Sequence, residues 1–189
     1  MTERPSRPCP WAAVGLLAVL SAAPSGQAET APAAAGTVAV PPGLSVLATL
    51  HAQGAQAYEC RAGTDGRLAW QFREPVATLL ENGRTVGRHY AGPSWELADG
   101  SAILLGRVAG RLLGAGADDI PWLRLEIAER RGTGRGPLAS TTAILRVNTS
   151  GGIADGGGCP VAGALWSVPY AADYLFLAPR RGDEGPGGG

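Results

Sequence analysis

Short runs of apolar and β-branched residues recur along this chain at intervals of about ten residues, and Gly, Pro or Asp separates one run from the next. In one run, Leu123, Leu125 and Ile127 alternate with polar or small residues, which is the period-two pattern of a half-buried strand. Strands at this spacing, without alternating helical patterns, are typical of antiparallel sandwiches and barrels. We therefore expect an all-β fold, an antiparallel β-sandwich or barrel-like single domain over residues 41–178.

Turn residues between the apolar runs set the expected bounds of the individual strands. The expected strands are Leu44–Ala52, Gln56–Ala62, Leu68–Arg73, Arg84–Tyr90, Ser101–Val108, Trp122–Arg130, Thr141–Asn148 and Tyr174–Leu177. Asp65-Gly66 between two runs predicts a hairpin. The segment Glu74–Glu81 is the exception: Pro75 in its first turn and Asn82-Gly83 after its end predict one short helix.

Residues 1–28 have the pattern of a secretory signal peptide, with two arginines, the apolar run Trp11–Leu20 and a small-x-small site ending at Ala28. Cleavage after Ala23 is the alternative. The apolar run is about half of what a spanning helix needs, so we expect no permanent membrane span. The protein is then secreted or periplasmic. Residues 29–40 are expected to be a linker and residues 179–189 a disordered tail.

Composition excludes two classes of protein. All 16 basic residues are arginine and they balance 16 acidic residues, whereas a nucleic-acid-binding protein needs a net basic surface. Apolar residues make up 45% of the chain, which is too many for a disordered protein. We expect no nucleic-acid partner.

After removal of the leader, Cys60 and Cys159 remain as an even pair in an oxidising compartment, which predicts a structural disulfide. A catalytic thiol is the alternative, but the chain has only two histidines and no feature that would lower a thiol pKa. A cysteine-rich metal site is disfavoured because neither cysteine has a C-x-x-C partner.

Five segments together resemble a known family. They are Gly54–Cys60, Trp70–Leu79, His89–Ser101, Ile120–Leu123, and Arg146–Gly152 followed by Cys159 and Val168–Phe176. The family is the exported bacterial and fungal one catalogued as domain of unknown function 3455, and the resemblance extends from about Pro41 to Leu177. It implies an exported, disulfide-bearing domain and no particular activity. Some relatives carry a dehydrogenase label, but this chain has no glycine-rich strand-to-helix turn, so we expect no nicotinamide site.

The central block offers candidate catalytic residues. Glu96 and Asp99 would form an acid–base pair of the kind glycosidases use if they converge, and His89 could relay a proton. The structural alternative is that Asp99-Gly100 is a hairpin turn and Glu96 an exposed strand residue. A metal site would need His51 and His89 together with carboxylates, and these two histidines lie on distant strands, so we expect no metal.

A second group of residues is a candidate for ligand binding: Tyr90, Trp95, Arg146, Asn148 and Tyr170. Aromatic side chains on the face of a sheet can stack on sugar rings, or they can fill the core. Trp95 is expected to be partly exposed. Arg146 and Asn148 are two residues apart and are expected on one strand face, where they could hold an anionic or sugar ligand or stabilise the loop.

Two functions therefore remain open at this stage. The first is an exported binding or structural module without a cofactor, whose unknown ligand could be a carbohydrate. The second is an extracellular hydrolase that acts on a polysaccharide-like polymer through the carboxylate pair.

Overall fold

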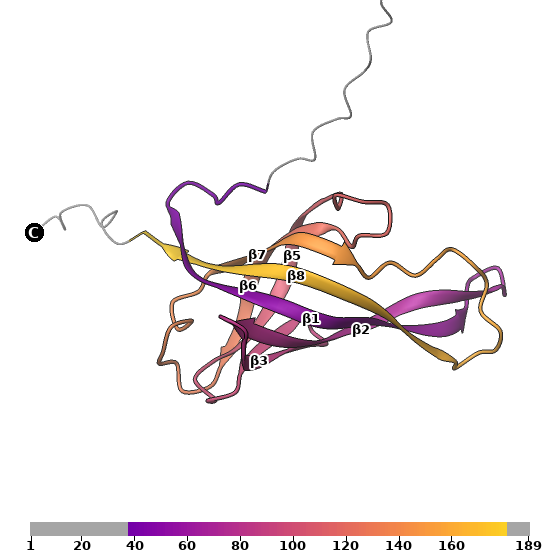
Figure 1. Ribbon diagram of the computed structural model, residues 1–189, viewed down its shortest axis with the longest axis horizontal. Coiled ribbons are helices and arrows are strands. Elements are labelled where there is room, and N and C mark those ends of the chain that lie inside the picture. Colours follow the sequence, from indigo (N-terminus) through magenta and orange to yellow (C-terminus); the bar gives the residue numbers. More distant parts are fainter. Residues whose placement is uncertain (1–37, 181–189) are drawn as a thin grey trace, which may run out of the picture. The chain divides into compact units, whose positions relative to one another are not determined.

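The computed structural model describes residues 38–180, and in this range the chain forms eight β-strands and no helix (Figure 1). The strands are β1 Leu44–Ala62, β2 Leu68–Glu81, β3 Arg84–Tyr90, β4 Ser94–Leu97, β5 Ile103–Leu112, β6 Trp122–Arg131, β7 Ala143–Gly151 and β8 Leu165–Pro179. The expected all-β class is confirmed. Among these residues no helix is long and apolar enough to cross a membrane. The expected signal peptide at 1–28, most of the expected linker and residues 181–189 of the expected tail lie outside the described residues.

The strands form one closed barrel in which each strand pairs antiparallel with its neighbours in the sequence. The first and last strands complete the ring, because β1 pairs with β8 from Leu44↔Pro179 to Glu59↔Leu165. Of the two expected architectures, sandwich and barrel, the chain adopts the barrel. A ring of eight strands has an interior that side chains can fill or that can accept one small ligand.

The helix expected at Glu74–Glu81 is wrong, because this segment is the second half of β2. Its burial has period two, with Ala77 and Leu79 inside the barrel and Val76 and Thr78 exposed. Asn82-Gly83 does not end a helix. With φ of 50° and 76°, these two residues form the tight turn of the β2–β3 hairpin, which requires positive φ at both positions.

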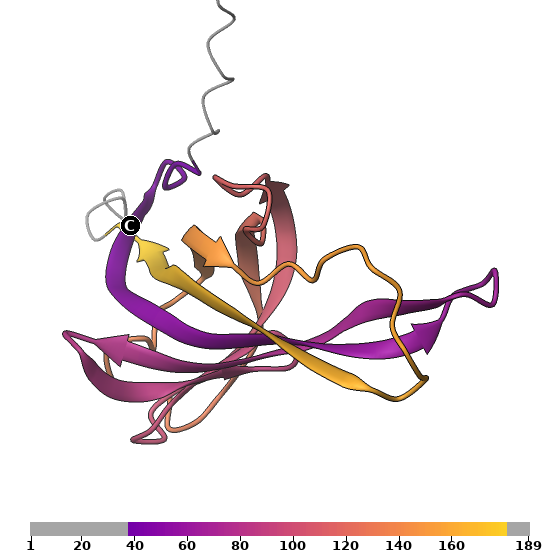
Figure 2. The same ribbon diagram turned by 45° about the vertical axis from the view of Figure 1, so that its right-hand side comes forward.

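Two prolines lie inside strands where the sheet has only one neighbour. At Pro75, β2 pairs with β1 alone, since its pairing with β3 begins at Ala77. At Pro169, β8 pairs with β1 alone, since its pairing with β7 begins at Tyr170. Proline lacks an N–H and is tolerated at such edges. These single-sided stretches belong to the part of β1, β2 and β8 that extends beyond the barrel (Figure 2).

Apolar side chains fill the barrel, and a smaller cluster covers the outside of β7 and β8. Leu79 and Phe176 are fully buried members of the interior cluster. Outside, Leu145 packs with Val38 and Val40, which precede the first strand. The end of the expected linker is thus part of the packed domain.

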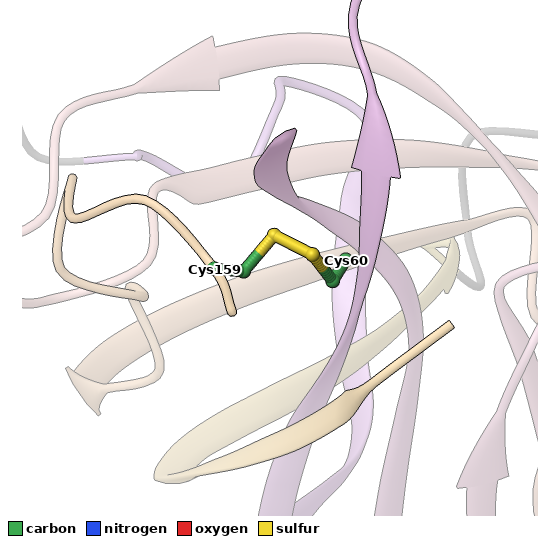
Figure 3. Close-up of a disulfide and its surroundings, with 2 residues drawn as sticks. All are labelled: Cys60 and Cys159. Carbon is green, nitrogen blue, oxygen red and sulfur yellow. A yellow bond between two sulfur atoms is a disulfide. The ribbon is translucent and has the colours of Figure 1, made fainter. Parts of the chain in front are cut away.

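The expected disulfide is present. Cys60 near the end of β1 bonds to Cys159 in the β7–β8 connection, 99 residues away, with the two Cα atoms 5.7 Å apart (Figure 3). Backbone hydrogen bonds reinforce the junction, since Cys60 N donates to Ala164 O and Gly163 N donates to Cys60 O, both at 2.9 Å. The connection between β7 and β8 is therefore attached to the extended part of β1.

Replacing both cysteines with alanine should lower the free energy of unfolding, because the crosslink restricts the unfolded chain. For a loop of this length the loss predicted from chain entropy is up to about 4–5 kcal/mol. Denaturant unfolding of the double variant and of the reduced native chain should give matching midpoints. An unchanged midpoint in both would contradict a stabilising role for the bond.

Candidate functional site

Three of the candidate residues are buried in the barrel interior: His89, Trp95 and Tyr170. The expected exposure of Trp95 is wrong, because its side chain is only 2% exposed. The physical reason is a glycine on the neighbouring strand. A Cβ at Gly106 would lie 2.8 Å from Cζ3 of the indole, so the absent side chain gives the ring its space. The indole of Trp95 therefore fits inside the barrel core.

His89 is held between aromatic rings. Its imidazole stacks on Trp95 with centroids 4.6 Å apart and planes 15° apart, and it meets the ring of Tyr174 at 4.9 Å. Nδ1 lies 2.8 Å from the carbonyl oxygen of Ser94, which can only accept, so Nδ1 carries the proton and donates. Burial lowers the pKa of His89 to about 4, with the Ser94 hydrogen bond opposing the shift and Arg146 adding to it. The ring is neutral at pH 7.

Glu96, by contrast, points outward and forms a polar cluster on the barrel surface. Its Oε2 accepts hydrogen bonds from Arg88 Nη2 at 2.9 Å and from the Tyr90 hydroxyl at 2.9 Å. The Arg88 guanidinium also lies 5.0 Å from the centroid of the Tyr90 ring. The hydrogen bond from Arg88, and then that from Tyr90, lower the pKa of Glu96. This carboxylate is ionised and paired.

Asp99 lies in the β4–β5 turn, as the structural alternative had it. Its Oδ1 accepts from the backbone N–H of Ser101 at 2.9 Å, and Gly100 has a φ of 69°. Hydrogen bonding by Ser101 lowers the pKa of Asp99. A general acid needs a raised pKa, and neither Asp99 nor Glu96 has one.

The three catalytic candidates are not brought together. Asp99 borders a small cavity with Leu50 and Leu97 at one end of the barrel. His89 borders a larger cavity with the β3–β4 turn and the start of β6, at the opposite end of these strands. Glu96 borders neither of these two cavities.

Arg146 and Asn148 lie on opposite faces of β7, so the expectation that they share one face is wrong. The register with β8 shifts between Val147 and Ser150, and Asn148 in this bulge has a φ of 49°. Its Nδ2 donates to Oδ2 of Asp173 on the outer face, at 2.8 Å. A bulge re-aims a side chain in this way because it adds an unpaired residue.

Arg146 points into the barrel. Its Nε and Nη2 donate to the carbonyl oxygen of Pro121 at 3.0 and 2.8 Å, which fixes the guanidinium and leaves Nη1 unused by either bond. On the outer face, Nδ1 of His51 lies 2.9 Å from Oδ1 of Asp173. His51 and His89 are therefore on different sides of the barrel wall, and the described residues contain no group of three or more His, Cys, Asp or Glu that could hold a metal ion.

The larger cavity, which we call the mouth pocket, has a volume of about 590 Å³. Its polar members are Gln56, His89 and Arg146, with Arg73 and Arg111 also in its wall. None of its lining residues is acidic. Phe72, Val108 and Ile153 are among its apolar members. A cavity of this size with a few convergent polar groups is the usual form of a small-molecule site.

One polar atom in the wall of the mouth pocket, Gln56 Nε2, is buried and has no hydrogen-bond partner among the described residues. Tyr170 and Tyr174 are buried in the barrel interior beside each other and near Arg146. Burial raises the pKa of both tyrosines, and the positive charge of Arg146 partly opposes the rise. Buried polar groups nearly always have a partner, so Gln56 offers the pocket a free hydrogen-bond donor.

Sequence reasoning missed Gln56 and Tyr174. A signal for Gln56 was present, since Leu50 and Ala52 are buried inside the barrel and Gln56 follows at the same even spacing along β1. In a strand, residues separated by two point to the same face. The expected split into Leu44–Ala52 and Gln56–Ala62 hid this continuity.

The titration of His89 predicts a pH dependence of stability. Its pKa is about 4 when folded, against 6.5 for an unperturbed histidine, so the unfolded chain binds the proton more readily between these values. The stabilisation is full above pH 6.5 and is lost as the pH falls, by about 2 kcal/mol between pH 7 and pH 5. Urea denaturation at several pH values between 7 and 5 measures this loss in the free energy of unfolding. His89→Gln should remove this part of the pH dependence; a pH dependence of the unfolding free energy equal to that of the native protein would refute the assignment.

A closed antiparallel barrel with a polar cavity at one end is the class of protein that these observations define. The family model described as protein of unknown function (DUF3455) matches residues 41–178, and the chain belongs to that family. This confirms the resemblance found in the sequence. No curated protein and no solved structure matches the chain.

Proposed function

We propose that this protein is an exported binding module that holds a small molecule in the mouth pocket. The observation that carries the proposal is a cavity of about 590 Å³ whose wall holds Gln56, with a buried and unpartnered Nε2, together with His89 and the guanidinium of Arg146. A bound molecule with a polar atom near Gln56 would supply the missing partner, which removes the cost of leaving that atom unpaired.

Two polar side chains of the pocket wall are held in place by contacts within the barrel. Pro121 fixes the guanidinium of Arg146, and the rings of Trp95 and Tyr174 fix His89. Fixed polar groups favour binding, because little side-chain freedom is lost when the ligand is taken up.

No observation favours the hydrolase alternative, in which Glu96 and Asp99 act as acid and base. Glu96 is paired on the outer surface, and Asp99 caps a turn. A carbohydrate ligand is not favoured either, because Trp95 and Tyr170, two of the aromatic residues that were candidates for stacking on sugar rings, are core residues.

Export is the second part of the proposal. The leader at 1–28 supports it, and the Cys60–Cys159 bond is compatible with an oxidising compartment. Expressed with its own leader in a bacterium with an outer membrane, the protein should accumulate outside the cytoplasm with Glu29, or Pro24 for the alternative cleavage, as its first residue. Intact mass spectrometry of fractionated cells measures this. Uncleaved protein with two free thiols in the cytoplasm would contradict export.

The mouth pocket should bind an uncharged fluorescent probe, N-phenyl-1-naphthylamine, with saturation at one probe per chain. Val108→Trp should reduce this binding by about tenfold or more, since the indole would occupy the mouth. Val46→Trp is the matched control, because Val46 and Val108 are both 44% exposed and only Val108 lines the pocket. Equal binding in both variants, or none in the native protein, would overturn the proposed site.

A further inference from the structure

The mouth pocket carries an excess of positive charge. Three arginines line it, and none of its lining residues is acidic. Arg73 is compensated, since its Nε lies 3.1 Å from Glu74 Oε1. For Arg111 and Arg146, no described carboxylate lies within ion-pair distance. The whole chain has a formal net charge of zero, so the excess is a local property of this pocket.

The inner end of the pocket is rich in hydrogen-bond donors. Arg146, whose guanidinium is held by its bonds to Pro121, and Gln56, which has an unpartnered Nε2, both line the pocket. Gln56 is only 3% exposed, so its amide is a built feature of the interior rather than a surface group. A negatively charged oxygen is the acceptor that such donors, next to an uncompensated guanidinium, bind most strongly.

The outer part of the pocket is apolar and exposed. Phe72 is 54% exposed, Val108 44% and Ile153 39%, and all three line the pocket although they come from β2, β5 and the β7–β8 connection. Exposed apolar side chains that surround a cavity mark a surface for an apolar ligand or partner. A small inorganic anion would leave them uncovered.

On the basis of the proposed binding function, we infer that the ligand is an amphipathic organic carboxylate. Its carboxylate lies at the inner end, against Arg146 and Gln56, and its apolar chain or ring lies along Phe72, Val108 and Ile153. The arrangement combines one charged contact for orientation with apolar contacts for affinity, which is how such cavities select ligands.

The test is displacement of N-phenyl-1-naphthylamine from the native protein by three eight-carbon molecules that differ in charge: octanoate, octanol and octylammonium. Octanoate should displace the probe at a concentration roughly 10- to 100-fold lower than octanol, because a hydrogen bond to a charged group contributes about 1.5–3 kcal/mol. Octylammonium should be the weakest. Inorganic phosphate should not compete below millimolar concentrations, since it has no apolar part.

Two variants assign the preference to the pocket. Arg146→Met should abolish the advantage of octanoate over octanol while leaving octanol unchanged. Arg130→Met is its matched control, because Arg130 also donates to a backbone carbonyl, that of Thr141, but does not line the pocket. Should Arg146→Met fail to fold, the exposed Arg111→Glu replaces it and should weaken octanoate roughly threefold or more at low salt.

The outcomes separate the two levels of the proposal. Equal displacement by octanoate and octanol, or an octanoate preference that survives both Arg146→Met and Arg111→Glu, would overturn the carboxylate assignment and leave the binding site standing. Phosphate that competes as well as octanoate would also overturn it, in favour of a small inorganic anion. If neither the probe nor octanoate binds, by fluorescence or by calorimetry, the proposed binding function itself fails.

Discussion

The pairing of β1 with β8 is the constraint on which the rest of the molecule depends. These two strands are 19 and 15 residues long, and their ladder runs from Leu44↔Pro179 to Glu59↔Leu165. Without it the sheet would have two open edges and its apolar face would have no enclosed interior. Because both strands are longer than the other six, the same ladder also continues past the barrel and carries the polypeptide that borders the mouth pocket.

Closure explains why the polar site is where it is. The aromatic cluster of His89, Trp95 and Tyr174 fills the middle of the barrel, so cavities occur toward its two ends, and the mouth pocket is the larger of the two described. At the mouth-pocket end the inward positions are taken by Gln56 and Arg146, which have polar groups that the packed centre could not accommodate. Along β1 and β7, the inward-facing side chains are therefore apolar where the barrel interior is packed and polar where it opens into the mouth pocket.

Local signals in the sequence predicted the class of fold, the hairpin at Asp65-Gly66, the strand Arg84–Tyr90 and the disulfide, because each depends on residues close in sequence or on one pair of cysteines. The predictions that were wrong concern features that the neighbouring strands decide. The segment Glu74–Glu81 has helix-like ends, but pairing with β1 and β3 decides its conformation. The burial of Trp95 depends on the absence of a side chain at Gly106. The side chain of Asn148 points outward because of a bulge in the pairing of β7 with β8. No pattern within these segments reports a missing side chain or a register shift on another strand.

The disulfide links two segments that each contribute a residue to the mouth pocket. Gln56 precedes Cys60 on β1, and Ile153 precedes Cys159 on the β7–β8 connection. If the proposed ligand contacts both segments more favourably when they are joined, its binding and the state of the two sulfurs are coupled. By thermodynamic reciprocity, the ligand would then make the bridge harder to reduce by the same factor by which reduction weakens binding.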